Sequence, residues 1–277
     1  MKSGPILVTG ATGYVGGRLI PALLDSGYRV RAMGRSLEKI GCRPWAGHSR
    51  VELVQGDVLD LESLKQAASG CRIAYYLVHS MIAQKKKFVE ADRRAAQNMA
   101  AAAAVSGIKR IIYLGGLAEA AKGDLSNHLK SRIEVADILQ AGPVPTTDLR
   151  TPMILGSGSA SFEILRYLVE RLPVMTTPRW VHSLNQPIAI RNVITYLVEC
   201  LNHDETIGQT YDIGGPDILT YRDLLDIYAE EANLPKRLII PVPVLTPTLS
   251  ALWIHLISPV PASIAQPLTC LLYTSDA

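Results

Sequence analysis

Residues 9–16 of the chain, which read Thr-Gly-Ala-Thr-Gly-Tyr-Val-Gly, constrain its fold more than any other stretch. The apolar residues 5–8 precede this stretch and predict a β-strand, while residues 14–24 carry apolar side chains at helical spacing. A strand, a glycine-rich turn and a helix in this order are typical of a pocket that holds the phosphates of a dinucleotide.

The three glycines of this stretch have separate tasks in such a pocket. Gly10 allows a tight turn, Gly13 allows the pyrophosphate to approach the backbone, and Gly16 allows the helix to pack on the strand. The free N–H groups and the positive end of the helix dipole then face the phosphates. The expected phosphate-binding residues are Gly10, Thr12, Gly13, Tyr14, Val15 and Gly16.

Beyond this unit, strand and helix patterns alternate up to Arg150, which predicts an α/β fold with a doubly wound parallel sheet, the Rossmann fold. Residues 1–155 are expected to form this domain, and residues 156–277 a smaller α/β lobe interleaved with it. Further strands are expected at 28–33, 51–55, 72–78, 109–114 and 146–150. A short helix that Asp60 can cap is expected after the strand at 51–55, and further helices are expected at 88–105, 128–140, 162–172, 192–201 and 220–232.

The spacing Gly-x-x-Gly-x-x-Gly resembles that of the extended and atypical short-chain dehydrogenase/reductase superfamily, including its NmrA-like branch. Within the superfamily, the chain is similar to a bacterial group of NAD(P)-binding atypical members that carry a C-terminal domain of unknown function. The segments that carry these resemblances are 75–81, 128–129, 149–160, 178–181, 186–190, 211–216 and 219–221. The resemblance implies nucleotide binding but defines no substrate.

The end of the second expected strand favours NADP over NAD, although NAD remains possible. NAD-preferring sites place an acidic residue about 20 residues beyond the glycine loop. Here Arg35 and Ser36 stand at that point, and an arginine can pair bidentately with a 2′-phosphate. The alternative is that Arg35 is an ordinary solvent-exposed arginine next to a turn.

Two further strand ends are expected to contact the cofactor. The resemblance implies that Asp57 and Val58 contact adenine, with Asp57 as a turn acceptor being the alternative. Val78, His79 and Ser80 follow the fourth strand, at the carboxyl edge where ligands bind in such sheets, and are expected near the ribose and pyrophosphate.

The superfamily's catalytic residues are replaced in this chain. Short-chain dehydrogenases use a Ser and a Tyr-x-x-x-Lys pair, in which the tyrosine is the acid/base. Here the strand that leads to the serine ends in Leu114-Gly115-Gly116, and His128 and Arg132 stand at the tyrosine and lysine positions.

Two interpretations of this replacement stay open. In the first, His128 is the general acid/base, and Arg132 binds cofactor hydroxyls and favours the neutral imidazole. In the second, catalysis is lost and the protein binds nucleotide as a sensor, scaffold or assembly factor. An apolar or weakly polar substrate would suit Met153, Phe162, Trp180 and Trp253, although each of these can equally be a core residue.

Charge and cysteine content narrow the classes of ligand and the cellular location that are expected for the protein. The net charge is +3, and the run Lys85–Lys87 is best interpreted as a solvated helix start, so nucleic acid is not an expected ligand. The four cysteines lack metal-ligand spacing, which predicts no metal site and reduced thiols in a cytoplasmic protein. No secretion signal or stretch of about 20 apolar residues is present. Residues 270–277 do not continue the preceding pattern, so a natural C-terminal domain is expected to be missing.

Overall fold

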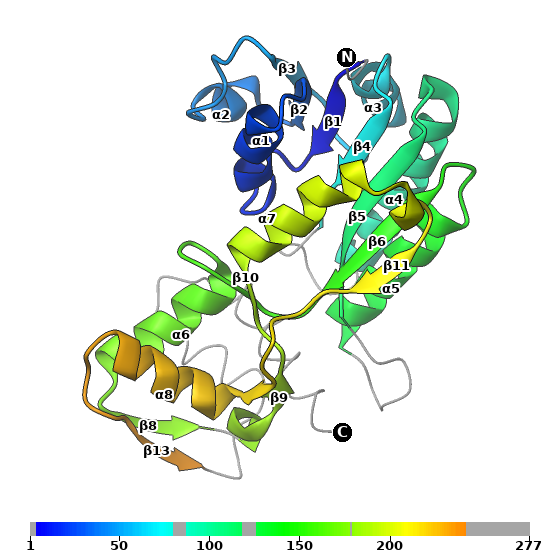
Figure 1. Cartoon of the computed structure of the whole chain (residues 1–277). Coiled ribbons are helices and arrows are strands. Elements are labelled where there is room, and N and C mark those ends of the chain that lie inside the picture. Colours follow the sequence, from blue (N-terminus) through cyan, green and yellow to red (C-terminus); the bar gives the residue numbers. More distant parts are fainter. Residues whose placement is uncertain (1–3, 80–86, 118–125, 178, 242–277) are drawn as a thin grey trace. The chain divides into compact units, whose positions relative to one another are not determined.

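The computed structural model describes residues 4–79, 87–117, 126–177 and 179–241 (Figure 1). The chain folds into two compact units and crosses between them several times. The first unit contains residues up to Gly116, Ser131–Arg150 and Ile190–Asp212. The second contains Leu117–Lys130, Thr151–Ala189 and residues from Ile213 onward.

The first unit is built on a seven-stranded parallel sheet, so the predicted fold class is confirmed. The strands lie in the order β11-β6-β5-β4-β1-β2-β3. This order reverses direction beside β1, as in a doubly wound sheet, and ligands bind such sheets outside the carboxyl ends of the strands at the reversal. The strands are β1 (Ile6–Thr9), β2 (Val30–Gly34), β3 (Val51–Gln55), β4 (Ile73–Tyr76), β5 (Arg110–Gly116), β6 (Thr146–Thr151) and β11 (Thr210–Asp212).

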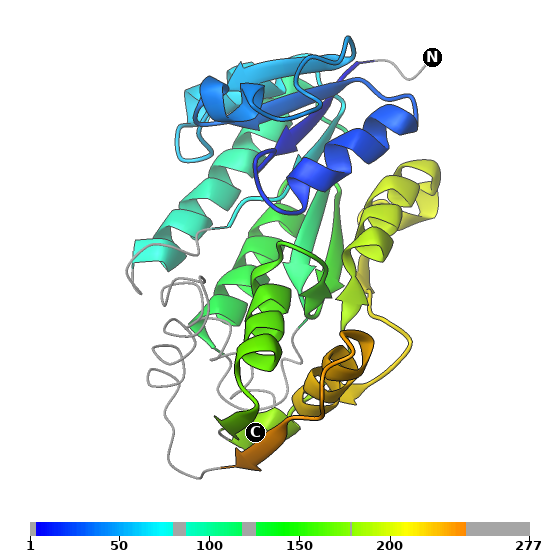
Figure 2. The same cartoon turned by 90° about the vertical axis from the view of Figure 1, so that its left-hand side faces the viewer.

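Helices cover both faces of this sheet (Figures 1 and 2). Residues of α3, α4 and α5 share one buried apolar cluster with the sheet, while α1 contacts α7 on the opposite face. The helices are α1 (Gly16–Asp25), α2 (Leu37–Gly41), α3 (Leu61–Ala68), α4 (Lys87–Ser106), α5 (Asn127–Gln140) and α7 (Ile190–Glu199), and α7 continues into the short 3₁₀ turns η2 (Cys200–Asn202) and η3 (Asp204–Thr206).

Local sequence signals explain several element boundaries. Asp60 accepts hydrogen bonds from the N–H groups of Glu62 and Ser63, and so caps α3 as its sequence position predicts. Helix α1 begins at Gly16, two residues later than predicted, because Gly13 N–H bonds the Gly10 carbonyl in a turn instead. The edge strand β11 was not predicted.

The buried side chain of Arg110 connects the turns η2 and η3 to the sheet of the first unit. The guanidinium of Arg110 on β5 donates to the hydroxyls of Thr147 and Thr206 and to the Cys200 carbonyl. Burial lowers the pKa of Arg110, and these bonds satisfy its donors. They also hold the segment that leads into β11 against β5 and β6.

The second unit packs two amphipathic helices, α6 (Ala160–Arg171) and α8 (Tyr221–Glu231), around a smaller apolar core. Helix α8 begins with a reciprocal capping box between Thr220 and Asp223. Three two-stranded sheets surround these helices: β7 (Ile154–Leu155) with β10 (Ile188–Ala189), β9 (Leu184–Asn185) with β12 (Leu219–Thr220), and β8 (Val174–Thr177) with β13 (Leu238–Pro241). The 3₁₀ turn η1 (Arg179–His182) follows β8.

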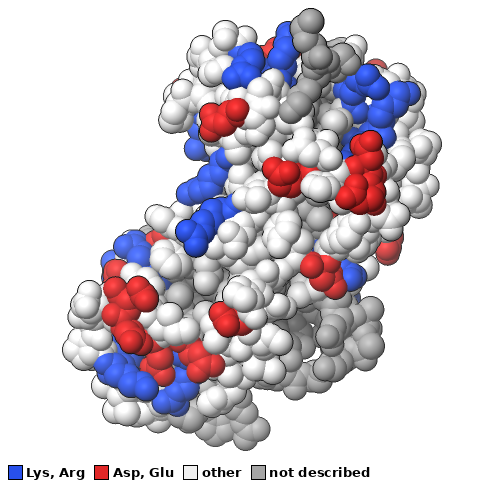
Figure 3. Space-filling model, in the orientation of Figure 1, with Lys and Arg blue, Asp and Glu red and all other residues white. Residues whose placement is uncertain are grey.

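Charged side chains of both signs are mixed over the surface. On the face shown in Figure 3, lysine and arginine side chains lie between aspartate and glutamate side chains. Ion pairs within each unit, such as Arg31–Glu52 at 2.8 Å and Arg166–Glu163 at 2.7 Å, contribute to this mixing. Within the described residues, no helix is both long and apolar enough to cross a bilayer.

Candidate functional site

The glycine loop follows β1 at the carboxyl edge of the sheet, and its backbone geometry requires glycine at two positions. Gly10 has a φ of +71°, and a Cβ there would lie 2.7 Å from the Leu77 carbonyl oxygen. A Cβ at Gly16 would collide with the Gly10 carbonyl oxygen. The helix start can therefore approach the end of β1 this closely only without a side chain at Gly16, and the end of β1 can lie this close to Leu77 only without one at Gly10.

The same loop leaves a surface of backbone N–H groups. Val15, the residue before helix α1, gives the helix no side-chain cap, and an uncapped helix start presents N–H donors and a partial positive charge. Gly13 is exposed at this point, with no side chain to keep a ligand away from the backbone. Thr12, Tyr14 and Val15 are half-buried around it. This arrangement can hold a diphosphate.

Two side chains from the segment after α2 hold the loop in place. Arg43 donates to the Thr12 carbonyl, and Trp45 Nε1 donates to the Gly17 carbonyl at 3.2 Å. These two bonds hold the carbonyl groups of Thr12 and Gly17 against the segment after α2. Neither residue was predicted to have a role, because no spacing or motif in the sequence links residues 43–45 to residues 12–17.

Arg35 and Ser36 follow β2 along the same edge. Arg35 is exposed, and its carbonyl accepts a hydrogen bond from Gln55 Nε2 at 3.1 Å, which fixes the backbone but leaves the guanidinium in solvent. The Ser36 hydroxyl accepts from the Lys39 N–H at 3.3 Å and caps α2. A hydroxyl that accepts one bond can still donate another, so both side chains can bind a phosphate.

Asp57 and Val58 follow β3. Asp57 Oδ1 accepts the Leu59 N–H at 3.0 Å, which is the turn-acceptor role considered for it. Val58 is buried, and its carbonyl accepts Asn98 Nδ2 from α4 at 2.9 Å. The turn is thus fixed on both sides, while the second carboxylate oxygen of Asp57 can still accept a bond from a ligand.

The residues after β4 complete this edge. Val78 is half-buried, and its Cγ2 lies 3.4 Å from the position of a Cβ on Gly10. The Thr9 hydroxyl donates to the Tyr75 carbonyl and accepts the Leu77 N–H, so the ends of β1 and β4 are joined directly below the loop. His79 is exposed, and Ser80 lies outside the described residues. The first unit therefore gathers the glycine loop, Val78 and the ends of β2 and β3 along one edge.

Helix α5 carries the two residues predicted for catalysis. The Ser126 hydroxyl accepts the Leu129 N–H at 3.3 Å, so His128 lies in a capped first turn, where it is half-buried. Arg132 follows one turn later, in the part of α5 that belongs to the first unit. Its Nη1 donates to the Leu114 carbonyl at 3.1 Å, and its own carbonyl accepts the Tyr113 hydroxyl at 3.3 Å. Arg132 therefore lies against β5 near its carboxyl end.

Asp148 on β6 is a buried ionisable residue that the sequence did not reveal. It is 2% exposed, and its Oδ1 has no hydrogen-bond partner among the described residues. Burial raises the pKa of Asp148 to about 6; Arg150 and Arg132 oppose the rise, and Asp212 adds to it. An ionisable carboxyl in such surroundings is more frequent in functional sites than in cores.

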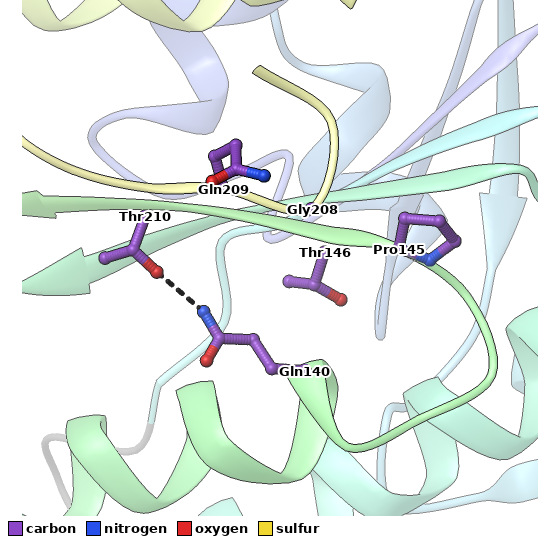
Figure 4. Close-up of a pocket in the computed structure, with 6 residues that line it drawn as sticks. All are labelled: Gln140, Pro145, Thr146, Gly208, Gln209 and Thr210. Carbon is purple, nitrogen blue, oxygen red and sulfur yellow. Dashed lines mark hydrogen bonds between the residues drawn. The ribbon is translucent and has the colours of Figure 1, made fainter. Parts of the chain in front are cut away.

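A pocket of the first unit lies away from this edge. It is lined by Gln140, Pro145, Thr146, Gly208, Gln209 and Thr210 (Figure 4). Thr146 and Thr210 are the first residues of β6 and β11, so the pocket is at the amino edge of these parallel strands, opposite the edge of the glycine loop. Its lining has no ionisable side chain, and Gln140 Nε2 already donates to the Thr210 hydroxyl at 2.8 Å. We do not assign it a ligand.

Comparison with known proteins agrees with this geometry. The sequence pattern of the NmrA-like family matches residues 2–247. The chain belongs to the NmrA-like family. The ceramide reductase of Caulobacter vibrioides is 30% identical to this NmrA-like chain over 175 residues, which cover 62% of the chain and 53% of that enzyme. The chain thus matches about half the length of this curated relative.

Solved structures share the fold of this NmrA-like protein at low sequence identity. The triphenylmethane reductase of Citrobacter sp., solved as a complex with NADP(H), has a TM-score of 0.76 and 20% identity, over 99% of this chain and 90% of its own. A nucleoside-diphosphate-sugar epimerase of Staphylococcus aureus has a TM-score of 0.77 and 18% identity, over 98% of this chain and 91% of its own. At these identities the similarity shows the fold alone.

Replacing Gly10 tests the loop geometry of the NmrA-like site. Gly10→Ala is expected to destabilise the fold by about 1–3 kcal/mol and to abolish nucleotide binding, because the positive φ and the Leu77 carbonyl both exclude a Cβ. Gly47→Ala is the matched control, since a Cβ there meets nothing within 4 Å. Urea unfolding and calorimetry measure both effects. Equal behaviour of the two variants would show that the described loop conformation is wrong.

Replacing Asp148 tests whether burial raises the pKa of its carboxyl group. The folded protein holds the Asp148 proton more tightly than the unfolded chain, so stability should fall as pH rises from about 4 to about 6. Asp148→Asn removes this loss and is expected to raise the free energy of unfolding at pH 7.5 by up to about 3 kcal/mol, with little change at pH 4. Asp137→Asn, at an exposed site on α5, should leave the pH dependence of stability unchanged. A pH-independent difference between wild type and Asp148→Asn would contradict the raised pKa.

Proposed function

We propose that this NmrA-like chain is an NADP(H)-dependent oxidoreductase that acts on a small apolar or weakly polar molecule. The observation that carries the proposal is the glycine loop, whose uncapped helix start and exposed Gly13 form a cradle that fits a diphosphate. The names of the ceramide reductase and of the NADP(H)-bound triphenylmethane reductase support the reaction class. A cytoplasmic location is part of the proposal and is supported by Cys42, Cys71 and Cys200, which are free thiols.

The cofactor-binding roles follow the edge of the sheet. N–H groups of the glycine loop bind the diphosphate, and Arg35 with Ser36 binds a 2′-phosphate. Asp57 and Val58 border adenine, while Val78, His79 and Ser80 approach the ribose and pyrophosphate. Arg132 binds ribose hydroxyls near the end of β5. The bound nicotinamide supplies hydride transfer, and these side chains orient it.

The proton required by a carbonyl reduction is assigned to His128. Its imidazole lies in the first turn of α5, and an unperturbed imidazole titrates near neutral pH, where a general acid is most effective. Arg132, one turn along the same helix, disfavours a second positive charge and so favours proton donation. His128 thus takes the role that the tyrosine has in short-chain dehydrogenases.

The second candidate function is a nucleotide-responsive binding protein without turnover. The observation that favours it is the missing side chain at Gly115 and Gly116, together with the absence of a Tyr-x-x-x-Lys pair on α5. Such a protein retains the whole glycine-loop edge and therefore binds the same nucleotides. Turnover alone separates the two functions.

Cofactor preference is tested by removing the guanidinium after β2. Arg35→Ala is expected to weaken NADP⁺ binding by about tenfold or more and NAD⁺ binding by less than about twofold, because only NADP⁺ has the 2′-phosphate. Arg29→Ala removes an equally exposed cation from before the same strand and is the control. Calorimetry with both nucleotides gives the dissociation constants. Tighter NAD⁺ binding by the wild type, or equal losses for both nucleotides, would exclude the proposed phosphate contact.

The proton-transfer role is tested by turnover. NADPH oxidation across a panel of aldehydes, ketones and quinones should reveal a substrate, and His128→Gln should lower kcat on it by about 100-fold or more without changing the NADP⁺ dissociation constant. His203→Gln, at an exposed histidine paired with Glu205, is the control. Full turnover by His128→Gln would exclude His128 as the acid. Stoichiometric nucleotide binding with no turnover across the panel would favour the binding protein.

A further inference from the structure

We propose that residues 249–257 of this chain form a helix that packs on the outer face of the sheet of β8 and β13 and completes the core of the second unit. The outer face is defined by the side chains of Val174, Leu238 and Ile240. The inference concerns the second unit and does not depend on the proposed function, because no residue of the glycine-loop edge takes part in it.

Strands β8 and β13 form a parallel pair with one covered and one open face. Side chains alternate between the two faces of a strand. Met175 and its partner Ile239 are buried in the apolar core that α6 and α8 share. Both helices lie on the same side of this sheet (Figures 1 and 2). Val174, Leu238 and Ile240 lie on the opposite face, where they are 50%, 58% and 43% exposed.

The parallel pairing makes an open apolar face unusual. Parallel sheets occur almost only with both faces covered, whereas an antiparallel sheet can expose one face that is then polar. Strand β13 reads Leu-Ile-Ile-Pro and is apolar on both faces, as in a strand that is covered on both sides. Its first N–H group, that of Leu238, donates to the Pro173 carbonyl at 3.1 Å, so the start of β13 is fixed. The outer face is thus a fixed apolar surface on which a further layer is expected.

The chain that follows β13 has the composition of a buried layer. Residues 238–275 contain no Asp, Glu, Lys or Arg, although these residue types make up 19% of the whole chain. A long uncharged stretch that is rich in leucine, isoleucine and valine is typical of packed structure and not of a solvated tail. From position 242 onward this stretch lies outside the described residues.

Within this stretch, the apolar pattern predicts one helix. Five apolar side chains recur at positions i, i+3, i+4, i+7 and i+8, which lie on one side of a helix: Leu249, Leu252, Trp253, Leu256 and Ile257. Pro247 precedes these positions and Pro259 follows them, and prolines are typical of both helix boundaries. A sheet with helices on both faces is the layer arrangement of α/β proteins.

The length of the connection allows this helix to return to the outer face. The residues between Pro241 and position 249 can span up to about 25 Å. The four-residue strand β13 is about 13 Å long, so the connection can turn back across the sheet.

A segment of the same chain suits this face better than a second copy of the protein. Three half-exposed side chains supply far less than the roughly 1,200 Å² that a specific interface between separate chains buries. A tethered segment has a high effective concentration at the face, so a small apolar contact is sufficient to hold it.

Photo-crosslinking of the full chain tests which molecule covers the face. Ile240 is replaced by p-benzoyl-phenylalanine, and the irradiated protein is analysed by mass spectrometry of its peptides. Crosslinks to residues 249–257 of the same chain are expected. The same probe in place of Ile227 on α8 is the control and should lose these crosslinks, because Ile227 is equally exposed, at 43%, but lies on a helix that packs against the covered face.

Two outcomes of this experiment overturn the inference. Crosslinks that join two chains, seen as a product of doubled mass, mean that a second copy covers the outer face. A probe at position 240 that gives no more crosslinks than the probe at position 227 means that the face is open to solvent.

A pair of charge substitutions tests the helix without a bulky probe. Leu256→Asp places a charge in the apolar stripe and is expected to speed amide hydrogen exchange in residues 238–240 by about tenfold or more. Ala251→Asp places the same charge on the opposite side of the helix and should change this exchange by less than about twofold. Equal effects of the two variants overturn the inference. Neither readout involves nucleotide, so a protein that binds no NADP⁺ or NAD⁺ contradicts the proposed function alone.

Discussion

The contact between the start of α1 and the end of β1 is the interaction on which the candidate site depends. Gly16 lies so close to the Gly10 carbonyl oxygen that it cannot carry a side chain, and at Gly10 the positive φ and the Leu77 carbonyl exclude one. This approach turns the chain sharply and leaves the first N–H groups of the helix without a side-chain cap at the carboxyl edge of the sheet. Thr9, Arg43 and Trp45 then hold the loop from β4 and from the segment after α2.

A second feature of the first unit is the packing at the end of β5. The end of β5 carries two glycines, and the space beside Gly115 is taken by the carboxyl group of Asp148. This carboxyl group is buried, and its Oδ1 has no hydrogen-bond partner in the part of the chain that the structure describes. Burial raises the pKa of Asp148, and the charges of Arg150 and Arg132 oppose the rise. A side chain at position 115 would therefore displace this carboxyl group.

The sequence predicted the sheet because its signals are local. Glycine spacing, apolar strands and amphipathic helices lie within single segments, and the helix cap at Asp60 was recognised in the same way. The strand β11 was missed because it has only three residues and all are exposed, so it carries no apolar pattern. Arg43, Trp45 and Asp148 were missed because their contacts join residues about 30 positions apart. In addition, all residues of β6 except Leu149 are polar, which suggests exposure where the structure shows burial.

Hydrogen–deuterium exchange with and without NADP⁺ tests the central claim most directly, because it reports on the backbone N–H groups themselves. If the glycine loop binds the diphosphate, nucleotide should slow amide exchange in residues 10–17 and 34–36, with little effect at the amino edge around residues 208–210. Nucleotide binding that leaves exchange in residues 10–17 unchanged would contradict the account.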